Sequence, residues 1–395
     1  MREKLLQKYA DKLSHLNQKN NVRAFYPLTH CKRHIRLAHG KSLLNLASND
    51  YLGVATNSDW QAEFLTNVAP KYQLGASSSR LLTGNFSIYE RLESRMQGLF
   101  GRSCLLFNSG YHANIGIIPA LCDDGTMILA DKLVHASMID GIRLSRAKCV
   151  RYAHQDFVQL ERLLQKYQDD DRIHQIVIMT ESIFSMDGDV TDLAMLVRLK
   201  NRYDKSMLYV DEAHAIGTHG MGGLGCGQDF GVLDEIDLVV GAFGKAMGSM
   251  GAYVICHQVL KKYLINVVRP LIFSTALPPI NVAWTDFVVA RIDKLGAERQ
   301  RLADLSAKLI AHVKDLGLAC GSKSHIVPIV LKENAKALAA AKLCQSHGLF
   351  ALAIRPPTVA INQARLRLCL NATISDDEFE KLQKVLDIIA WQVQS

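Results

Sequence analysis

The chain has 395 residues, 49% of them hydrophobic and 21% charged, which suits a soluble protein with one large domain and one smaller domain. No apolar run approaches the roughly 18 residues that a membrane-spanning helix needs, and the nine cysteines form no CxxC pair, so we predict neither a membrane protein nor a metal site. The formal net charge of +8 is dispersed along the chain, which argues against nucleic-acid binding and suits an acidic partner such as a phosphorylated carrier protein.

The N-terminal segment is polar over residues 1–22 and has no apolar core of the kind found in signal peptides. Together with the odd number of cysteines, this predicts a cytoplasmic protein with reduced thiols. We assign residues 1–50 to an N-terminal helix and arm, because apolar residues recur there at helical spacing. These apolar residues are Leu5, Leu6, Tyr9, Leu13 and Leu16.

Short apolar runs alternate with helical segments between about residue 90 and residue 260. The runs are continuously apolar, which is typical of strands buried on both faces of a mainly parallel sheet. Helical segments between them include residues 157–168 and 193–203. The alternation predicts an α/β domain over residues 51–285, with ligands bound beyond the carboxyl ends of the strands. The predicted strands are residues 104–107, 127–130, 175–180, 207–210, 237–242 and 252–256.

The last part of the chain has a different pattern, which predicts a smaller α+β domain over residues 286–395. A long helical stretch, residues 280–316, leads into it. The predicted elements that follow are a strand at 326–331, a helix at 335–347, a Pro-rich turn, a strand at 364–370 and a final helix at 376–393.

Lys245 follows the predicted strand 237–242, in the sequence Gly-Ala-Phe-Gly-Lys-Ala. A lysine just past a buried strand can lie in the ligand crevice, where desolvation lowers its pKa and makes it a nucleophile for a Schiff base. The alternative is a lysine in a surface loop. That alternative is the more common outcome when a single motif is considered alone.

Asp211 ends the predicted strand 207–210 and can serve the same chemistry. A carboxylate there can pair with the protonated pyridine nitrogen of pyridoxal phosphate and keep the ring able to accept electrons. His214, three residues on, could reach the ring hydroxyl. Ser182, after strand 175–180, is placed to hydrogen-bond the same cofactor. The ordinary alternatives are a helix N-cap aspartate, a core histidine and a turn serine.

Two further segments follow predicted strands. Gly110 and Tyr111 would lie at the N-terminus of an apolar helix, where backbone N–H groups and the helix dipole bind phosphate. His135 could stack its imidazole on the cofactor ring. A helix cap and a structural histidine are the alternatives. All these groups fall on one rim of the predicted sheet, and this agreement in location predicts a pyridoxal-phosphate enzyme.

The chain resembles the α-oxoamine synthases, a branch of the fold-type I pyridoxal-phosphate enzymes, from about Arg23 to the C-terminus. The resemblance implies a large domain with a mainly parallel seven-stranded sheet and a smaller α+β C-terminal domain. It also implies a homodimer with active sites at the subunit interface. The landmarks that carry it are residues 48–53, 75–80, 135–137, 181–189, 211–214, 243–245 and 273–279.

The resemblance also implies a role for each site residue. Lys245 would carry the cofactor and act as a base, Asp211 would pair with the pyridine nitrogen, and His135 would stack on the ring. Cofactor contacts are implied for Lys245, Gly110, Tyr111, His135, Ser182, Asp211 and His214. Arg355 would bind the carboxylate of the amino acid. Substrate contacts are implied for Arg23, Asn49, Arg355 and Thr358.

The segment 353–359, Ala-Ile-Arg-Pro-Pro-Thr-Val, narrows the resemblance further, together with Ala-Arg-Leu-Arg-Leu at 364–368. It is similar to members that join L-alanine to a pimeloyl thioester, on coenzyme A or acyl carrier protein, with loss of CO2. The alternatives are a member that uses glycine or serine, an aminotransferase, and a non-catalytic cofactor-binding protein.

Two positions depart from the family pattern. The Thr or Ser that commonly stands three residues before the lysine is Ala242, and the Tyr that commonly precedes Ser-Thr is Phe273. Each change removes a hydroxyl near the expected phosphate. Because a hydrogen bond contributes about 1 kcal/mol, we expect weaker binding of the cofactor.

Overall fold

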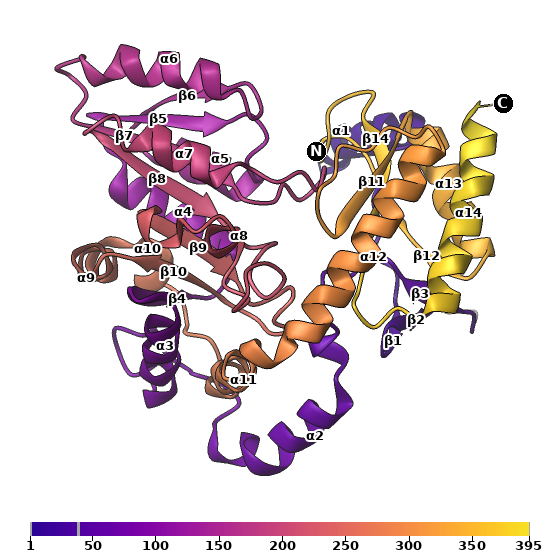
Figure 1. Cartoon of the computed structure of the whole chain (residues 1–395), viewed down its shortest axis with the longest axis horizontal. Coiled ribbons are helices and arrows are strands. Elements are labelled where there is room, and N and C mark those ends of the chain that lie inside the picture. Colours follow the sequence, from indigo (N-terminus) through magenta and orange to yellow (C-terminus); the bar gives the residue numbers. More distant parts are fainter. Residues whose placement is uncertain (1, 38–39, 395) are drawn as a thin grey trace. The chain divides into compact units, whose positions relative to one another are not determined.

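The structure is a computed structural model that describes residues 2–37 and 40–394. Positions 1, 38, 39 and 395, which fall within the predicted N-terminal arm and C-terminal domain, lie outside the described residues. The chain, labelled from α1 to α14 in Figure 1, divides into two compact units. The first unit comprises Met1–Asn49, Met186–Asp189 and Arg301–Ser395, and the second comprises Asp50–Ser185 and Val190–Gln300. The domain bounds given above, residues 1–50, 51–285 and 286–395, remain predictions.

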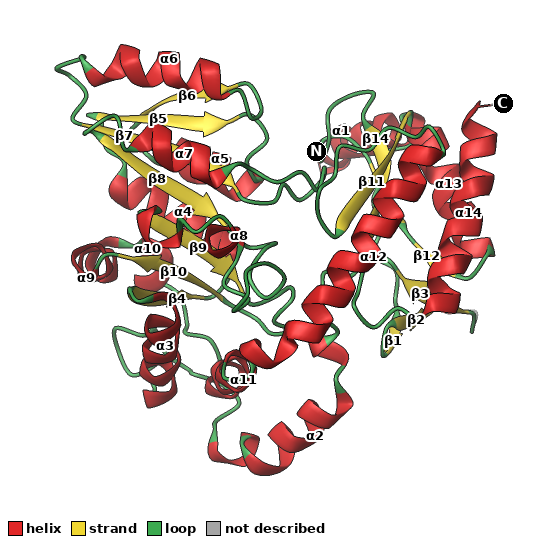
Figure 2. Cartoon of the chain, in the orientation of Figure 1, coloured by secondary structure: helices red, strands yellow, loops and turns green. Residues whose placement is uncertain are grey.

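The second unit contains a seven-stranded sheet in the order β4-β10-β9-β8-β7-β5-β6. Figure 2 shows these strands as yellow arrows. β10 is antiparallel to both of its neighbours, β4 and β9, and the other pairs of strands are parallel, so the prediction of a mainly parallel seven-stranded sheet is confirmed. The strands are β4 (Ser103–Phe107), β5 (Thr126–Asp131), β6 (Lys148–Tyr152), β7 (Gln175–Glu181), β8 (Ser206–Asp211), β9 (Leu238–Ala242) and β10 (Ala252–Cys256).

The strand β6 is the one that the apolar runs did not predict. It lies at the edge of the sheet, where it pairs with β5 alone. Its residues Lys148–Tyr152 are mostly exposed or half-buried, and two charged side chains, Lys148 and Arg151, keep the sequence there from forming a continuous apolar run. An edge strand with charged side chains is also protected from pairing with other chains.

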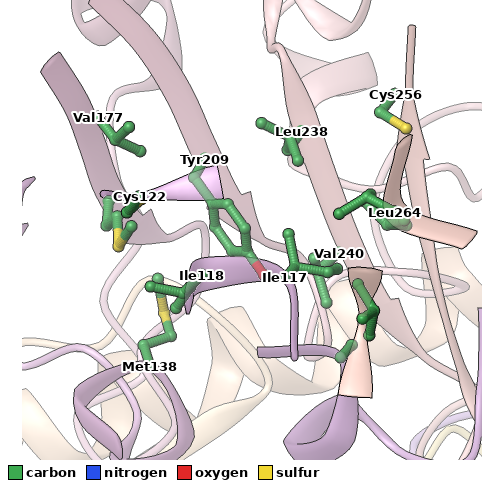
Figure 3. Close-up of a cluster of buried hydrophobic side chains, with 14 of the residues drawn as sticks. Ile117, Ile118, Cys122, Met138, Val177, Tyr209, Leu238, Val240, Cys256 and Leu264 are labelled. Carbon is green, nitrogen blue, oxygen red and sulfur yellow. The ribbon is translucent and has the colours of Figure 1, made fainter. Parts of the chain in front are cut away.

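The inner strands are buried on both faces because helices cover both. One cluster of side chains joins the sheet to α4 (Gly110–Leu121), α5 (Ala136–Leu144), α9 (Gln258–Val267) and α10 (Arg269–Ile272). Figure 3 shows part of it, including Ile117, Tyr209 and Val240. Since successive side chains of a strand point to opposite faces, the alternate residues face α6 (Phe157–Gln168) and α7 (Leu193–Lys200), which contact β5, β7 and β8.

Short polar side chains fix where several of these helices begin. Asp156 and Asp192 cap α6 and α7 by accepting backbone N–H groups, and Ser109 does the same for α4. The predicted helix at 157–168 is confirmed. The predicted helix at 193–203 ends earlier, at Lys200, because the next residues close tight turns such as Tyr203 N–H to Lys200 C=O.

The predicted continuous helix over residues 280–316 is wrong. The structure has α11 (Pro279–Val289), a 3₁₀ turn at Ile292–Leu295 and α12 (Gly296–Asp315). Ile292 and Leu295 are both buried, so the chain turns at this point and keeps both side chains in the core. The apolar pattern is continuous across the break, which is why periodicity alone did not reveal it.

The second unit is completed by short elements around the sheet. They are η1 (Val54–Thr56), α2 (Ser58–Asn67), η2 (Ala69–Lys71), α3 (Ser87–Phe100), α8 (Cys226–Asp229) and η3 (Leu233–Glu235).

The described residues of the first unit form two small sheets and four helices, counting the part of α12 that belongs to it. The smaller α+β domain predicted for the end of the chain is confirmed, as are its strands and its last two helices. The sheets have the orders β1-β2-β3-β12 and β11-β14-β13. Among the described residues, no helix is both long enough and apolar enough to span a bilayer. The elements are α1 (Arg2–Gln18), β1 (Thr29–Cys31), β2 (His34–Arg36), β3 (Ser42–Asn45), β11 (Ile326–Lys332), α13 (Asn334–Ser346), β12 (Leu349–Phe350), β13 (Leu352–Ile354), β14 (Ala364–Cys369) and α14 (Asp376–Gln394).

Candidate active site

The N-terminus of α4 lies beside the end of β9. Ser109 caps the helix by accepting the N–H of His112 at 3.2 Å. The first-turn amides of Gly110 and Tyr111 have no acceptor within the helix, as at any helix start. A Cβ atom placed on Gly110 would lie 3.8 Å from the Cβ of Ala242. The predicted phosphate site and the position that lacks a hydroxyl are therefore neighbours.

Tyr111 projects from the same turn and is 45% exposed. Its hydroxyl donates to Asp140 of α5 at 2.5 Å, and this hydrogen bond raises the pKa of the phenol. The contact holds the Tyr111 ring at the edge of the phosphate site.

Lys245 is half-buried in the turn that follows β9. The turn is closed by hydrogen bonds from Gly248 N–H to Lys245 C=O and from Ser249 N–H to Phe243 C=O, both 2.9 Å. Burial lowers the pKa of His135, and the charge of Lys245 lowers it further. Burial raises the pKa of Glu181, and Lys245 opposes that rise. Lys245 thus acts electrostatically on His135, which follows β5, and on Glu181, which ends β7.

Asp211 ends β8 and its carboxylate is buried and held at both oxygens. Oδ1 accepts the N–H of Ala213 at 2.9 Å, and Oδ2 accepts Nδ2 of Asn114 at 3.0 Å. The structure therefore brings an oriented carboxylate to the same edge of the sheet as Lys245.

Ser182 and Glu212 form a second buried pair at this edge. Ser182 donates its hydroxyl to Glu212 at 2.5 Å, so the predicted contact of Ser182 with the cofactor ring stays a prediction. Burial raises the pKa of Glu212 to about 7, against the hydrogen bonds it accepts from Ser182 and from the backbone of Cys226 and Gly227. Position 225 requires glycine, because φ is 106° and a Cβ there would lie 2.9 Å from the Glu212 carboxylate.

His214 is also buried in the second unit, where its Nδ1 lies 2.7 Å from the hydroxyl of Tyr51. With His214, all seven predicted cofactor residues belong to one compact unit. Their individual roles stay predictions.

The four predicted substrate residues belong to the first unit. Arg23 donates to Thr358 Oγ1 at 2.8 Å, and Arg355 donates to the backbone carbonyls of Asn20 and Val22. Burial lowers the pKa of Arg355, and the like charge of Arg23 adds to the effect. Two guanidinium groups close to each other favour an anionic ligand.

Asn49, the fourth of these residues, has a different hydrogen-bond partner from Arg23 and Arg355. Its side-chain oxygen accepts from Arg367 of β14 at 3.2 Å. The structure therefore joins Arg23, Arg355 and Thr358 and places Asn49 on a different set of partners.

The second unit suits pyridoxal phosphate by the chemistry of its donors. Lys245 supplies the amine, Asp211 a buried carboxylate, and α4 an N-terminal anion site. Glu181 is buried nearby, and no described residue gives a hydrogen bond to its Oε1. Ala242 provides one hydroxyl fewer than the family pattern. The residues present therefore fit the cofactor, and the weaker phosphate contact stays a prediction.

The buried residues at the site that were not predicted include Asn114, Ser137 and Tyr209. Each forms hydrogen bonds to a predicted residue or to another of the three. A signal existed for Asn114, which is an amide within the apolar helix of residues 110–121 and must be hydrogen-bonded if buried. Ser137 and Tyr209 carry no comparable signal in the sequence.

Comparison with known proteins identifies the family. The family model for aminotransferases of class I and II matches residues 41–386. The chain belongs to this family. An 8-amino-7-oxononanoate synthase from Haemophilus ducreyi is 49% identical over 383 residues, which cover 95% of this chain and 98% of that protein.

Solved structures agree with this assignment. A serine palmitoyltransferase from S. paucimobilis with a bound PLP–myriocin aldimine has a TM-score of 0.91, 25% identity and 99% coverage of both chains. An 8-amino-7-oxononanoate synthase from Francisella tularensis has a TM-score of 0.76 and 28% identity, covering 89% of this chain and 98% of that one. The predicted α-oxoamine synthase branch, fold type, acyltransferase class and pyridoxal-phosphate cofactor are confirmed.

Proposed function

We propose that the protein catalyses the 8-amino-7-oxononanoate synthase reaction of biotin synthesis. L-Alanine and a pimeloyl thioester would give the amino ketone, CO2 and the free thiol. The observation that carries the proposal is the 49% identity, over nearly the full length of both chains, to the Haemophilus ducreyi enzyme of that name. The arrangement of Lys245, Asp211 and the α4 N-terminus supports it.

Each group of the second unit has a part in this proposal. Bound pyridoxal phosphate supplies an electron sink for bond breaking at the Cα atom of the amino acid. Lys245 holds the cofactor and is the base for the Cα proton. Asp211 keeps the pyridine nitrogen protonated, and His135 covers the ring. The amides of Gly110 and Tyr111 bind the phosphate.

Selection of the amino acid is assigned to the first unit. The guanidinium of Arg355 can bind a carboxylate with two parallel hydrogen bonds. Arg23, whose charge acts on Arg355 and whose side chain donates to Thr358, adds to the positive potential. We assign Arg355 to the carboxylate of L-alanine, and Arg23 and Thr358 to further contacts with the substrate. We assign Asn49 to the lining of the site.

The proposal extends to the assembly and the acyl donor. We propose a cytoplasmic homodimer with shared active sites, as the family resemblance implies. The net charge of +8 suits an acidic acyl carrier protein as the carrier of the pimeloyl group. Coenzyme A, which is also anionic, is the other donor to test.

The test is an assay of the purified holoenzyme with two thioesters and three amino acids. Pimeloyl-coenzyme A and pimeloyl acyl carrier protein are each incubated with L-alanine, glycine or L-serine. Released thiol is followed by a colorimetric reagent and the product by mass spectrometry. We expect thiol release and the alanine-derived ketone, with Lys245→Ala inactive and the exposed-lysine control Lys262→Ala active.

Each contrary result points to a different enzyme. Thiol release with glycine or serine but not with alanine would assign the chain to another branch member, and serine is the amino acid of the structural neighbour's name. Pyruvate formation without thiol release would indicate an aminotransferase. No turnover, with cofactor bound, would leave a cofactor-binding protein.

A further inference from the structure

Asn114 of α4 is 1% exposed and uses both ends of its amide group. Its Nδ2 donates to Asp211 Oδ2 at 3.0 Å and to Ser137 Oγ at 2.9 Å. Its Oδ1 accepts the hydroxyl of Tyr209 at 2.6 Å. Asn114 is thus a branch point between the strand that ends in Asp211 and the helix that follows His135.

The fold brings these side chains together by ordinary periodicity. Tyr209 and Asp211 are two residues apart on β8, so both side chains point to the α4 face of the sheet. Asn114 shares a helix face with Ile117 and Ile118, three and four residues on, which pack into the same buried cluster. Figure 3 shows the ring of Tyr209 within that cluster, with its oxygen directed towards α4.

The orientation of the Asn114 amide follows from its neighbours. In the opposite orientation, Oδ1 would face the carboxylate of Asp211, and two acceptors would meet in a buried site without a proton between them. The hydroxyl of Tyr209 supports the observed orientation by donating to Oδ1. Both amide protons are therefore directed to Asp211 and Ser137.

The second branch sets the proton of the His135 ring. Ser137 Oγ accepts from Asn114, so its own proton is available to His135 Nδ1, which lies 2.7 Å away. The backbone N–H of Ser137 also donates to Nδ1, at 3.2 Å. A nitrogen that accepts two hydrogen bonds carries no proton, so the ring proton is on Nε2.

The charges around His135 agree with this assignment. Burial lowers its pKa and the charge of Lys245 lowers it further, whereas Asp211 and Asp140 oppose the shift. The ring is therefore neutral near pH 7, with Nδ1 as the acceptor and Nε2–H as the donor.

We propose that Asn114, held by Tyr209, is a positioning residue of the cofactor site, which orients Asp211 and, through Ser137, fixes the ring proton of His135 on Nε2. The proposal rests on the assignment of Asp211 and His135 to the cofactor and not on the identity of either substrate. A single amide in α4 thereby sets two groups that reach the site from different strands.

The test separates the two branches with four variants. Asn114→Leu removes both branches, Tyr209→Phe removes the hydroxyl that holds the amide, and Ser137→Ala removes the branch to His135 alone. Tyr253→Phe is the matched control, because Tyr253 lies buried on β10 in the same sheet and no described residue hydrogen-bonds its hydroxyl. Urea unfolding of each variant identifies any that fail to fold.

Two measurements are made on the protein. Titration with pyridoxal phosphate gives the dissociation constant of the cofactor. A pH titration of the cofactor-bound protein gives the pH midpoint of the absorption band of the lysine-bound cofactor. Because a hydrogen bond to a charged group is lost, we expect a dissociation constant about 10-fold to 100-fold higher in Asn114→Leu. We expect about a 10-fold rise in Tyr209→Phe and a value unchanged within twofold in Tyr253→Phe. The pH midpoint should move in Asn114→Leu and Tyr209→Phe only.

The ring proton of His135 is read from ¹⁵N-histidine spectra of the holoenzyme, with His135→Asn identifying the signal. We expect the Nε2–H form in the natural protein. In Ser137→Ala we expect part of the rings to take the Nδ1–H form, a part limited by the backbone N–H at position 137, which still donates to Nδ1. Equal dissociation constants in Tyr209→Phe and Tyr253→Phe would overturn the first branch. An unchanged His135 signal in Ser137→Ala would overturn the second. If Asn114→Leu does not fold, these two comparisons still decide. Neither comparison measures substrate turnover. A wrong assignment of the substrates is therefore distinguishable from a wrong role for Asn114.

Discussion

Replacing Ala242 with threonine should tighten the binding of pyridoxal phosphate. Ala242 is the last residue of β9, is 9% exposed, and its Cβ lies beside the N-terminus of α4, where the phosphate is expected. A hydroxyl on this Cβ would give the phosphate one more hydrogen-bond donor, beside the amides of Gly110 and Tyr111. Threonine suits the backbone, because β-branched residues are favoured in strands.

The size of the effect follows from the geometry. A hydrogen bond to a charged group contributes about 1.5 kcal/mol at the lower end of measured values, which is roughly a tenfold change in a dissociation constant. The site is largely buried already, so the new hydroxyl loses little additional water on binding. We therefore expect about tenfold tighter binding in Ala242→Thr.

The assay is titration of the cofactor-free protein with pyridoxal phosphate, followed by the absorption of the lysine-bound form. The matched control is Ala242→Val, which has the shape of threonine without the hydroxyl. We expect Ala242→Val to bind no better than the natural protein. Equal affinities of the threonine and valine variants would refute the reasoning, since the gain would then come from packing or not exist.

Three further predictions concern the site and the core. Lys245→Ala should lose the absorption band of the lysine-bound cofactor and all turnover, as measured by spectroscopy and thiol release. Because the pKa of Glu212 is raised from 4.5 to about 7, its contribution to stability is present below pH 4.5 and lost as pH rises through 7. Relative to Glu212→Gln, the natural protein should lose about 3 kcal/mol of unfolding free energy over that window, measured with urea. Ile178→Ala, at a fully buried position of β7, should lower the unfolding free energy by about 2–5 kcal/mol.

Each of these predictions has a control or an outcome that would contradict it. Lys262→Ala should keep the absorption band, because Lys262 is exposed on α9. Val158→Ala, at an exposed position of α6, should change the unfolding free energy by less than about 0.5 kcal/mol. A pH dependence of stability that is the same in Glu212→Gln and the natural protein would contradict the role of Glu212. A small effect of Ile178→Ala would contradict the burial argument.

The sequence by itself determined six of the seven strands of the large sheet and the positions where chemistry is expected. Apolar runs identify strands buried on both faces, since no other element needs so many consecutive apolar residues over so short a length. Polar residues that follow such runs must lie at one edge of a parallel sheet. That reasoning led to Lys245, Asp211 and His135, and in the structure both Lys245 and Asp211 act on the pKa of His135.

Only the tertiary structure decided how those residues are held. Asn114 and Asp211 are 97 positions apart in the chain, and no local pattern relates them. The same is true of Ser182 and Glu212, 30 positions apart, whose contact uses the hydroxyl predicted to face the cofactor. The break between α11 and α12 likewise depends on what Ile292 and Leu295 pack against. Periodicity in a sequence reports which face of an element is buried, whereas the partner of a buried polar group is set by elements that meet only after folding.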